Sequence, residues 1–227
     1  MKTKMIRVTC IIALILSCCS QAYAFSDVAL TDELHSNSIN NLNQLGIING
    51  YEDGTFRPNS SITRAEMVQI ISNIIPITNY TPVGTITVGE IYSDISMDYW
   101  ANDVIMRVSN LNYINGYEDG TFKPENNITY AEAIKIIATM LNYNYEAEKN
   151  GGYPDGYIQI AEDIGITSGL EFNKNSYVSR EDVAVMINNA LSIPHLVIIS
   201  YNIDGNIILE EDGNLTFSNI INNARNN

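Results

Sequence analysis

One stretch of the chain occurs twice almost unchanged, and this repetition constrains the fold more than any local pattern does. Residues 45–58 read LGIINGYEDGTFRP and residues 111–124 read LNYINGYEDGTFKP, at a constant offset of 66 residues. The same offset takes residues 62–66, ITRAE, to residues 128–132, ITYAE. Self-similarity of this length predicts an architecture made of copies of one supersecondary unit.

A third and more divergent copy follows the first two. Residues 164–169 read IGITSG, Phe172 takes the place of the loop phenylalanine, and residues 178–182 read VSRED. The loop of this copy is three residues shorter and has lost the Glu-Asp-Gly-Thr turn. We therefore expect three unequal copies of one repeat.

Each copy carries the apolar periodicity of two helices. Apolar residues recur three positions apart in the first helix and at helical spacing in the second, so each helix presents an apolar stripe. The stripes of the first helices comprise Ile39, Leu42, Leu45, Ile105, Val108, Leu111, Ile158, Ala161 and Ile164. Because one helix pair cannot bury both stripes alone, we predict a mainly α fold: a pseudo-threefold trimer of helix-loop-helix repeats around a shared core.

The second helix of each copy begins with a capping motif. The motifs are Thr63-x-x-Glu66, Thr129-x-x-Glu132 and Ser179-x-x-Asp182. In such a capping box the hydroxyl accepts from a backbone amide of the first turn, and the acid reaches back to the cap residue. We therefore interpret these acids as caps and not as general acids, and we expect the shorter Asp182 to complete its box less well.

The first 24 residues have the pattern of a secretory signal peptide. Basic residues precede an apolar stretch over residues 8–16, and small residues end the segment at Ala22-Tyr-Ala24. We expect cleavage after Ala24 and export to the cell wall or surface layer, with lipoprotein processing at Cys18 as the minority alternative. All three cysteines lie in this segment. The mature chain then has no thiol for a disulfide, a zinc site or a nucleophile.

Charge narrows the class of partner. Loss of residues 1–24 removes three of the twelve Lys and Arg residues and none of the 26 acidic ones, so the formal net charge changes from −14 to −17. An acidic surface disfavours nucleic acid and anionic membranes. No later segment approaches the roughly 20 apolar residues of a membrane span, and no motif calls for a cofactor.

After Pro194 the pattern changes to short apolar runs separated by Asp204-Gly205 and Asp212-Gly213. This pattern indicates two hairpin turns and a short antiparallel β-meander. The expected organisation is then a signal peptide at 1–24, repeat 1 at 25–75, a linker at 76–91, repeat 2 at 92–144, repeat 3 at 145–193 and an extension at 194–227.

Taken together, Phe25-x-Asp27, the loop Gly-Tyr-x-Asp-Gly-Thr-Phe-x-Pro and the helix start Thr-Arg-Ala-Glu resemble the S-layer homology (SLH) family over roughly residues 25 to 191. The opening element returns at Tyr92-x-Asp94, close to Trp100. The resemblance implies a trimer of repeats whose grooves bind secondary cell-wall polysaccharide, often through a pyruvylated terminal N-acetylmannosamine. It also implies a non-catalytic anchoring role.

Arg64 and Arg180 are the first candidate ligand-binding residues. Each follows a helix cap, where the helix dipole disfavours a cation, whereas a ligand carboxylate would be held by the guanidinium and the helix amides together. An arginine paired with one of many acidic neighbours is the plain alternative. Tyr130 replaces the arginine in the second copy, and Lys123 could supply a cation there. Asp53 and Thr55 are further candidates, although turn formation also explains them.

Other functions fit the sequence less well. A calcium loop starting at Asn49 would place Tyr51 at the third ligand position and Ser60 at the twelfth. The mature chain has His35 and His195 but no hydrolase motif, so a wall glycoside hydrolase would depend on paired carboxylates. A structural role through protein-protein contacts stays open. Trp100 could stack on a sugar, but we expect it in the core.

Overall fold

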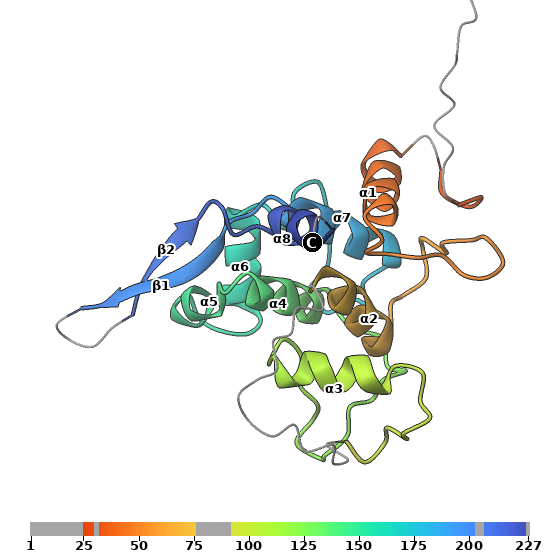
Figure 1. Cartoon of the computed structure of the whole chain (residues 1–227), viewed down its shortest axis with the longest axis horizontal. Helices are drawn as coiled ribbons and strands as arrows, with labels where there is room; N and C mark the ends of the chain where they lie inside the picture. The colour runs from red at the N-terminus through yellow and green to blue at the C-terminus, as the bar shows by residue number, and fades with distance from the viewer. Residues whose placement is uncertain (1–24, 30–31, 76–91, 203–206, 226–227) are drawn as a thin grey trace, which may run out of the picture.

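The computed structural model describes residues 25–29, 32–75, 92–202 and 207–225, and it shows a mainly helical protein with one small sheet (Figure 1). The predicted signal peptide and the predicted linker at 76–91 lie outside the described residues. The elements are α1 (Glu33–Gln44), α2 (Arg64–Ile74), α3 (Asn102–Asn110), α4 (Tyr130–Met140), α5 (Asn144–Lys149), α6 (Asp155–Asp163), α7 (Arg180–Ala190), β1 (His195–Tyr201), β2 (Ile207–Asp212) and α8 (Phe217–Arg225).

The first helix of each repeat packs against the second helix of another repeat. α1 packs against α7, α3 packs against α2, and α6 packs against α4. The first helix of each repeat therefore lies on the second helix of the preceding repeat, counted around the ring, as the neighbouring positions of α1 and α7 in Figure 1 illustrate. Each apolar stripe is therefore buried against a helix of another repeat.

A closed ring of backbone hydrogen bonds joins the three repeats just before their second helices. The amide of Ile62 donates to the carbonyl of Val178 at 3.1 Å, that of Val178 to Ile128 at 3.0 Å, and that of Ile128 to Ile62 at 3.1 Å. Each repeat thus gives one donor and one acceptor in the same sense. This cyclic relationship is the pseudo-threefold frame of the fold.

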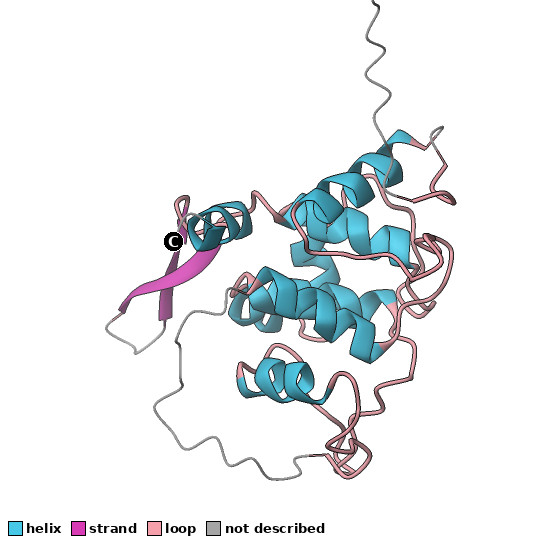
Figure 2. Ribbon diagram, turned by 45° about the vertical axis from the view of Figure 1, so that its right-hand side comes forward, coloured by secondary structure: helices cyan, strands magenta, loops and turns pink. Residues whose placement is uncertain are grey.

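The second helices form the interior of the protein. α2, α4 and α7 bury side chains on several faces, whereas α1 and α3 bury a single stripe. Figure 2 shows α3 at the edge of the helical layer, consistent with an outer position. The expected core positions Ile39, Leu42, Ile105 and Val108 are all buried.

The predicted caps are present, and the third one differs. Thr63 and Thr129 accept from the amides of Glu66 and Glu132, whose carboxylates bond back to the cap amides. Ser179 accepts from the amide of Asp182, but the shorter Asp182 side chain bonds to the Ser179 hydroxyl and not to the Ser179 amide. The box of the third repeat is therefore incomplete, as its sequence predicts.

The structure explains why the loops have glycine at positions 50 and 116. Gly50 and Gly116 each lie beneath an aromatic ring, that of Phe25 in the first repeat and that of Tyr92 in the second. A Cβ on Gly50 would lie 2.3 Å from Cε1 of Phe25, and one on Gly116 would lie 2.2 Å from Cε1 of Tyr92. Each ring therefore packs on bare backbone, which fixes the opening element against its loop.

The C-terminal segment corrects one prediction. β1 and β2 form an antiparallel hairpin that projects from the helices (Figure 2), but the second Asp-Gly turn leads into α8 and not into a third strand. Thr216 Oγ1 accepts from the amide of Asn219, and Phe217 and Ile221 are buried at helical spacing. The apolar pair and the hydroxyl cap favour a helix, so the predicted meander is a hairpin followed by a helix.

Candidate ligand sites between the repeats

Both arginines that follow the helix caps are buried and hold the loop of the next repeat. Arg64 is 5% exposed, and its Nε and Nη2 donate to the carbonyls of Phe122 and Asn115 at 2.7 and 2.8 Å. Arg180 is 8% exposed and bonds in the same way to the carbonyls of Phe56 and Asn49. These contacts explain much of the need for arginine without any ligand.

The amides at the helix starts are also occupied, which corrects the expected mechanism. The amides of Arg64 and Ala65 donate to the carbonyls of Asn126 and Pro124 at 2.9 and 3.0 Å. Those of Arg180 and Glu181 donate to the first-repeat loop in the same way. A ligand carboxylate therefore finds no free helix amide there, and only the guanidinium edges remain for it.

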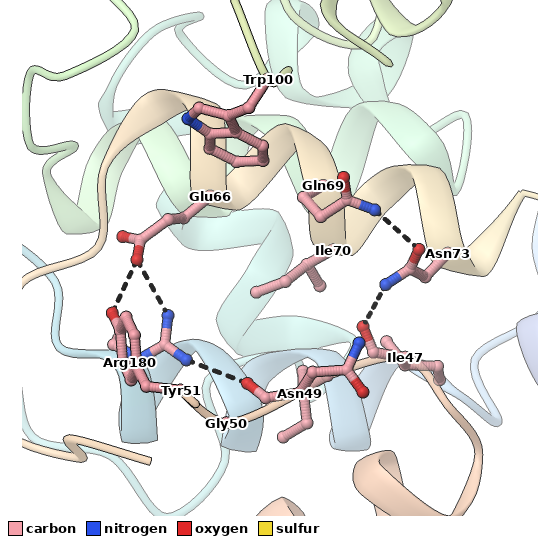
Figure 3. A pocket seen from close by; sticks show the side chains of 11 residues that line it. Ile47, Asn49, Gly50, Tyr51, Glu66, Gln69, Ile70, Asn73, Trp100 and Arg180 are labelled. Carbon is pink, nitrogen blue, oxygen red and sulfur yellow. Dashed lines mark hydrogen bonds and ion pairs between the residues drawn. The ribbon is translucent and has the colours of Figure 1, made fainter. Parts of the chain in front are cut away.

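Figure 3 shows the pocket that contains Arg180, which we call the Arg180 site. The first repeat supplies most of the lining, the third repeat supplies Arg180, and the second supplies Trp100. The lining residues are Ile47, Ile48, Asn49, Gly50, Tyr51, Glu66, Gln69, Ile70, Asn73, Trp100 and Arg180. All three repeats therefore meet at this site.

The charge of Arg180 is compensated inside its own site. Glu66 Oε1 lies 3.3 Å from Arg180 Nη1 and also accepts from the Tyr51 hydroxyl at 2.7 Å. The ring of Tyr51 contacts two cations, with its centroid 3.8 Å from Arg57 Cζ and 4.8 Å from Arg180 Cζ.

Trp100 is 60% exposed and lines the pocket, so our expectation that it lies in the core is wrong. The indole faces the Arg180 site from across α2 (Figure 3). It stands just before α3, the outer helix that packs on α2. The packing of α3 from the second repeat on α2 from the first repeat therefore places this aromatic ring at the site.

The positions equivalent to the lining of the Arg180 site define an Arg64 site, which comprises Arg64, Asn115, Gly116, Tyr117, Glu132, Lys135 and Tyr153. Its guanidinium has no ion pair among the described residues. Its Cζ lies 4.8 Å from the Tyr117 ring centroid and 4.5 Å from that of Phe122. Burial lowers the pKa of Arg64, and the nearby charges of Tyr117 and Glu132 only partly oppose that effect. The uncompensated cation distinguishes this site from the first.

A second cation belongs to the Arg64 site. Lys135 occupies the position that Gln69 has in the Arg180 site, and its Nζ lies 5.1 Å from the Tyr153 ring centroid. Tyr153 stands at the position of Trp100, is 48% exposed, and has a pKa raised by burial and then by the charge of Glu132. Sequence spacing could have singled out Lys135, because it lies one helical turn after the capping acid.

Lys123 contacts two residues of its own loop, Tyr117 and Asp119. Its Nζ lies 4.1 Å from the Tyr117 ring centroid and 3.0 Å from Asp119 Oδ2. These contacts do not link Lys123 to Tyr130, and its role as a ligand-binding cation stays a prediction.

Asp53 and Thr55 lie in the exposed turn of the first loop and bond to each other. Asp53 Oδ1 accepts from the amide and the hydroxyl of Thr55, and Arg57 donates to Oδ2. These hydrogen bonds hold the pKa of Asp53 at about 2. Neither residue lines the pocket, so the turn accounts for both.

Tyr130 lies in a third site that is filled by the protein itself. Its ring stacks on Phe172 with centroids 5.3 Å apart, and its hydroxyl donates to Asp182. The other oxygen of Asp182 lies 2.9 Å from Nε2 of His35, which α1 brings in from the first repeat. Leu34 stands where the other sites have Trp100 and Tyr153, in contact range of Gly169. The three sites are thus unequal.

No metal site is evident among the described residues, where no three His, Cys, Asp or Glu side chains are grouped to hold an ion. Within the same ranges, every helix is too short or too polar to cross a membrane.

Comparison with known proteins identifies the repeats. The S-layer homology domain family matches residues 24–68 and 91–134. The "Cell surface protein" of Thermoanaerobacter kivui is 27% identical over 214 residues, which is 92% of this chain and 26% of that protein. The "Middle cell wall protein" of Brevibacillus brevis is 26% identical over 85% of this chain and 18% of its own length.

The "Cellulosome-anchoring protein" of Acetivibrio thermocellus is 33% identical over 100 residues, 44% of this chain and 22% of that protein. The chain thus spans about a quarter or less of the length of these relatives. The two ranges that match the family include the loops and the second-helix starts of the first two repeats. The chain therefore contains repeats of the S-layer homology family.

Proposed function

We propose that this chain is a non-catalytic anchoring module of the cell surface, which binds an acidic secondary cell-wall polysaccharide at the Arg64 site. The observation that carries the proposal is the uncompensated, buried guanidinium of Arg64 with Lys135 at the same site. In a chain with 26 acidic and 12 basic residues, two cations without a carboxylate partner suit an anionic ligand. A pyruvylated terminal sugar offers such a carboxylate.

The printed names of the relatives support the setting. A cell surface protein, a middle cell wall protein and a cellulosome-anchoring protein share these repeats. We propose export through residues 1–24 and a position at the wall. We propose no catalytic role, because Glu66 and Glu132 serve as helix caps.

We also propose that residues 25–75, 92–144 and 145–193 act as three repeats, with 194–227 as an extension. The third repeat is supported by its place in the backbone ring through Val178 and by the contacts of Arg180, which match those of Arg64. The fold needs all three, because each second helix packs with a helix of another repeat.

The proposal is tested by sedimentation of residues 25–227 with purified cell walls. We expect the chain to pellet with intact walls and to stay in solution with walls from which the secondary polymer has been removed chemically. Retention on bare peptidoglycan would refute the ligand class.

Lys135→Gln, which gives the Arg64 site the residue of the other site, should weaken wall binding by about two- to fivefold, the worth of one partly exposed ion pair. Lys149→Gln is the matched control, since Lys149 is equally cationic but 59% exposed on α5 near Glu146. Equal losses in both variants would show a general charge effect and not a site.

A second candidate function, assembly through protein contacts, has one observation in its favour. The hairpin exposes Ile198, Ile199 and Tyr201, each more than half accessible. Association of the protein in the absence of any glycan, measured by sedimentation velocity, would support it.

A further inference from the structure

The Arg180 and Arg64 sites are equivalent in position but differ in charge. Gln69 and Lys135 occupy the same place in α2 and α4, 66 residues apart. Arg180 has an ion pair with Glu66, whereas Arg64 has none among the described residues. The Arg64 site therefore has an excess of positive charge that the Arg180 site lacks.

Glu66 is firmly held where a ligand carboxylate would have to approach Arg180. Its Oε1 accepts from Tyr51 and Arg180, and its Oε2 accepts from the amide of Thr63 at 2.9 Å. Moving Glu66 aside would break the helix cap and the tyrosine contact together. A carboxylate in this pocket would instead lie beside a fixed negative charge, which is unfavourable.

The remaining polar groups of the pocket are neutral amides. Gln69 donates to Asn73 Oδ1 at 2.9 Å, and Asn73 donates to the carbonyl of Ile47 at 2.9 Å, so this pair of side chains is oriented by the backbone (Figure 3). The carbonyl oxygen of Gln69 makes no hydrogen bond to the described residues. Amides held in this way recognise hydroxyl and acetamido groups.

Trp100 adds a flat apolar surface on the side of the pocket facing these amides (Figure 3). Its indole is 60% exposed, although a tryptophan ring is costly to leave in water. Aromatic rings stack well on the C–H faces of sugar rings, which carry no net charge. An exposed indole opposite oriented amides is the arrangement that an uncharged saccharide would need.

We infer that the Arg180 site binds an uncharged saccharide unit, with its ring against Trp100 and its hydroxyl or acetamido groups against Gln69, while a carboxylated unit binds at the Arg64 site. The inference rests on the proposed function in taking the ligand to be a wall glycan. It adds that the two sites select sugars of different charge.

Trp100 provides the test, because it is the single tryptophan of the chain and stands in the Arg180 site. Its fluorescence is followed while residues 25–227 are titrated with the methyl glycoside of N-acetylmannosamine, and separately with the same glycoside carrying a pyruvate ketal. We expect the neutral glycoside to change the fluorescence and to bind at least as tightly as the ketal. A tenfold preference for the ketal, or no response to the neutral glycoside, would overturn the inference.

Gln69→Lys tests the charge argument directly. It should strengthen binding of the ketal at Trp100 by about two- to fivefold and leave the neutral glycoside little changed. Lys135→Gln is the matched control and should leave both Trp100 titrations unchanged. No gain in Gln69→Lys would contradict the inference.

Wall sedimentation separates this inference from the proposed function. Wall binding that depends on the polymer, together with a silent Trp100, would refute the inference alone. A Trp100 response to the neutral glycoside without wall binding would support the inference and refute the anchoring role.

Discussion

Arg180 donates a hydrogen bond from Nε to the carbonyl oxygen of Phe56, 124 residues earlier in the chain, at 2.9 Å. Arg64 makes the equivalent bond to Phe122 at 2.7 Å. Each of these two arginines therefore ties one repeat to the loop of the next. It belongs to the framework of the fold as well as to a ligand site.

Replacing Arg64 or Arg180 by alanine should lower the free energy of unfolding by about 2–4 kcal/mol, because each change leaves a buried phenylalanine carbonyl and a partly buried asparagine carbonyl without their donors. Denaturant unfolding followed by circular dichroism measures the effect. A loss of wall binding in either variant is thus informative only where the variant is shown to be folded.

Arg57→Ala is the control for this prediction. Arg57 is also an arginine of the first loop, but its ion pair with Asp53 is exposed, with side chains 48% and 52% accessible. Such a pair contributes about 1 kcal/mol or less. If Arg180→Ala proved no more harmful than Arg57→Ala, the framework role would be wrong.

Much of the local structure follows from the sequence. The capping motifs at Thr63 and Thr129 predict where α2 and α4 begin, because a hydroxyl followed three residues later by an acid satisfies the first amides of a helix. The weaker cap at Ser179 was also predictable, since one methylene fewer in Asp182 shortens its reach. The capping motif occurs in all three repeats, which strengthens the prediction of each helix start.

The contacts between repeats were not predictable in the same way. Periodicity shows that a helix has an apolar stripe but not which helix covers it, so the pairing of α1 with α7 was hidden. The contacts of Lys123 were unpredictable for the same reason. Lys123 is close to Tyr130 in sequence, but in the structure it contacts Tyr117. α8 was missed because Thr and Phe also suit a strand, and only the burial of Ile221 decides for a helix.

The pKa of His35 should lie above the ordinary histidine value of 6.5, and the pKa of His195 should lie below it. Burial alone would lower the pKa of His35, but hydrogen bonds to Asp182 and Asp32 outweigh it and raise the pKa above 6.5. Burial lowers the pKa of His195, which packs edge-on against Phe217. Two-dimensional NMR of the imidazole signals over a pH series measures both, and a His35 pKa below that of His195 would contradict the structure.

The direction of the pKa shift of His35 determines how the stability of the protein changes with pH. A raised pKa means that His35 stabilises the contact of α1 with α7 below about pH 6.5, and that this contribution is lost as pH rises through the folded value. Asp182→Asn should bring the pKa of His35 down and flatten that dependence. Asn keeps the size of the side chain, so a large structural change is not expected.

α8 should contribute strongly to stability even though it follows the last repeat. Phe217 is 4% exposed, and the amide of the next residue, Ser218, donates to the carbonyl of Leu191 at 2.9 Å. Phe217→Ala should lower the free energy of unfolding by about 3 kcal/mol, as for other buried rings. Ile208→Ala on the exposed face of the hairpin is the control and should change it by less than about 0.5 kcal/mol.

Tyr130 decides whether the third site takes part in binding. If its hydroxyl serves the fold, Tyr130→Phe should remove the bond to Asp182, keep the stack on Phe172, and lower the free energy of unfolding by about 1–2 kcal/mol. Wall binding should stay as it was, because Leu34 and His35 fill the site. If instead Tyr130→Phe weakened wall sedimentation as much as Lys135→Gln does, while thermal unfolding was unchanged, the tyrosine would be a ligand-binding residue and the third site would be open to glycan.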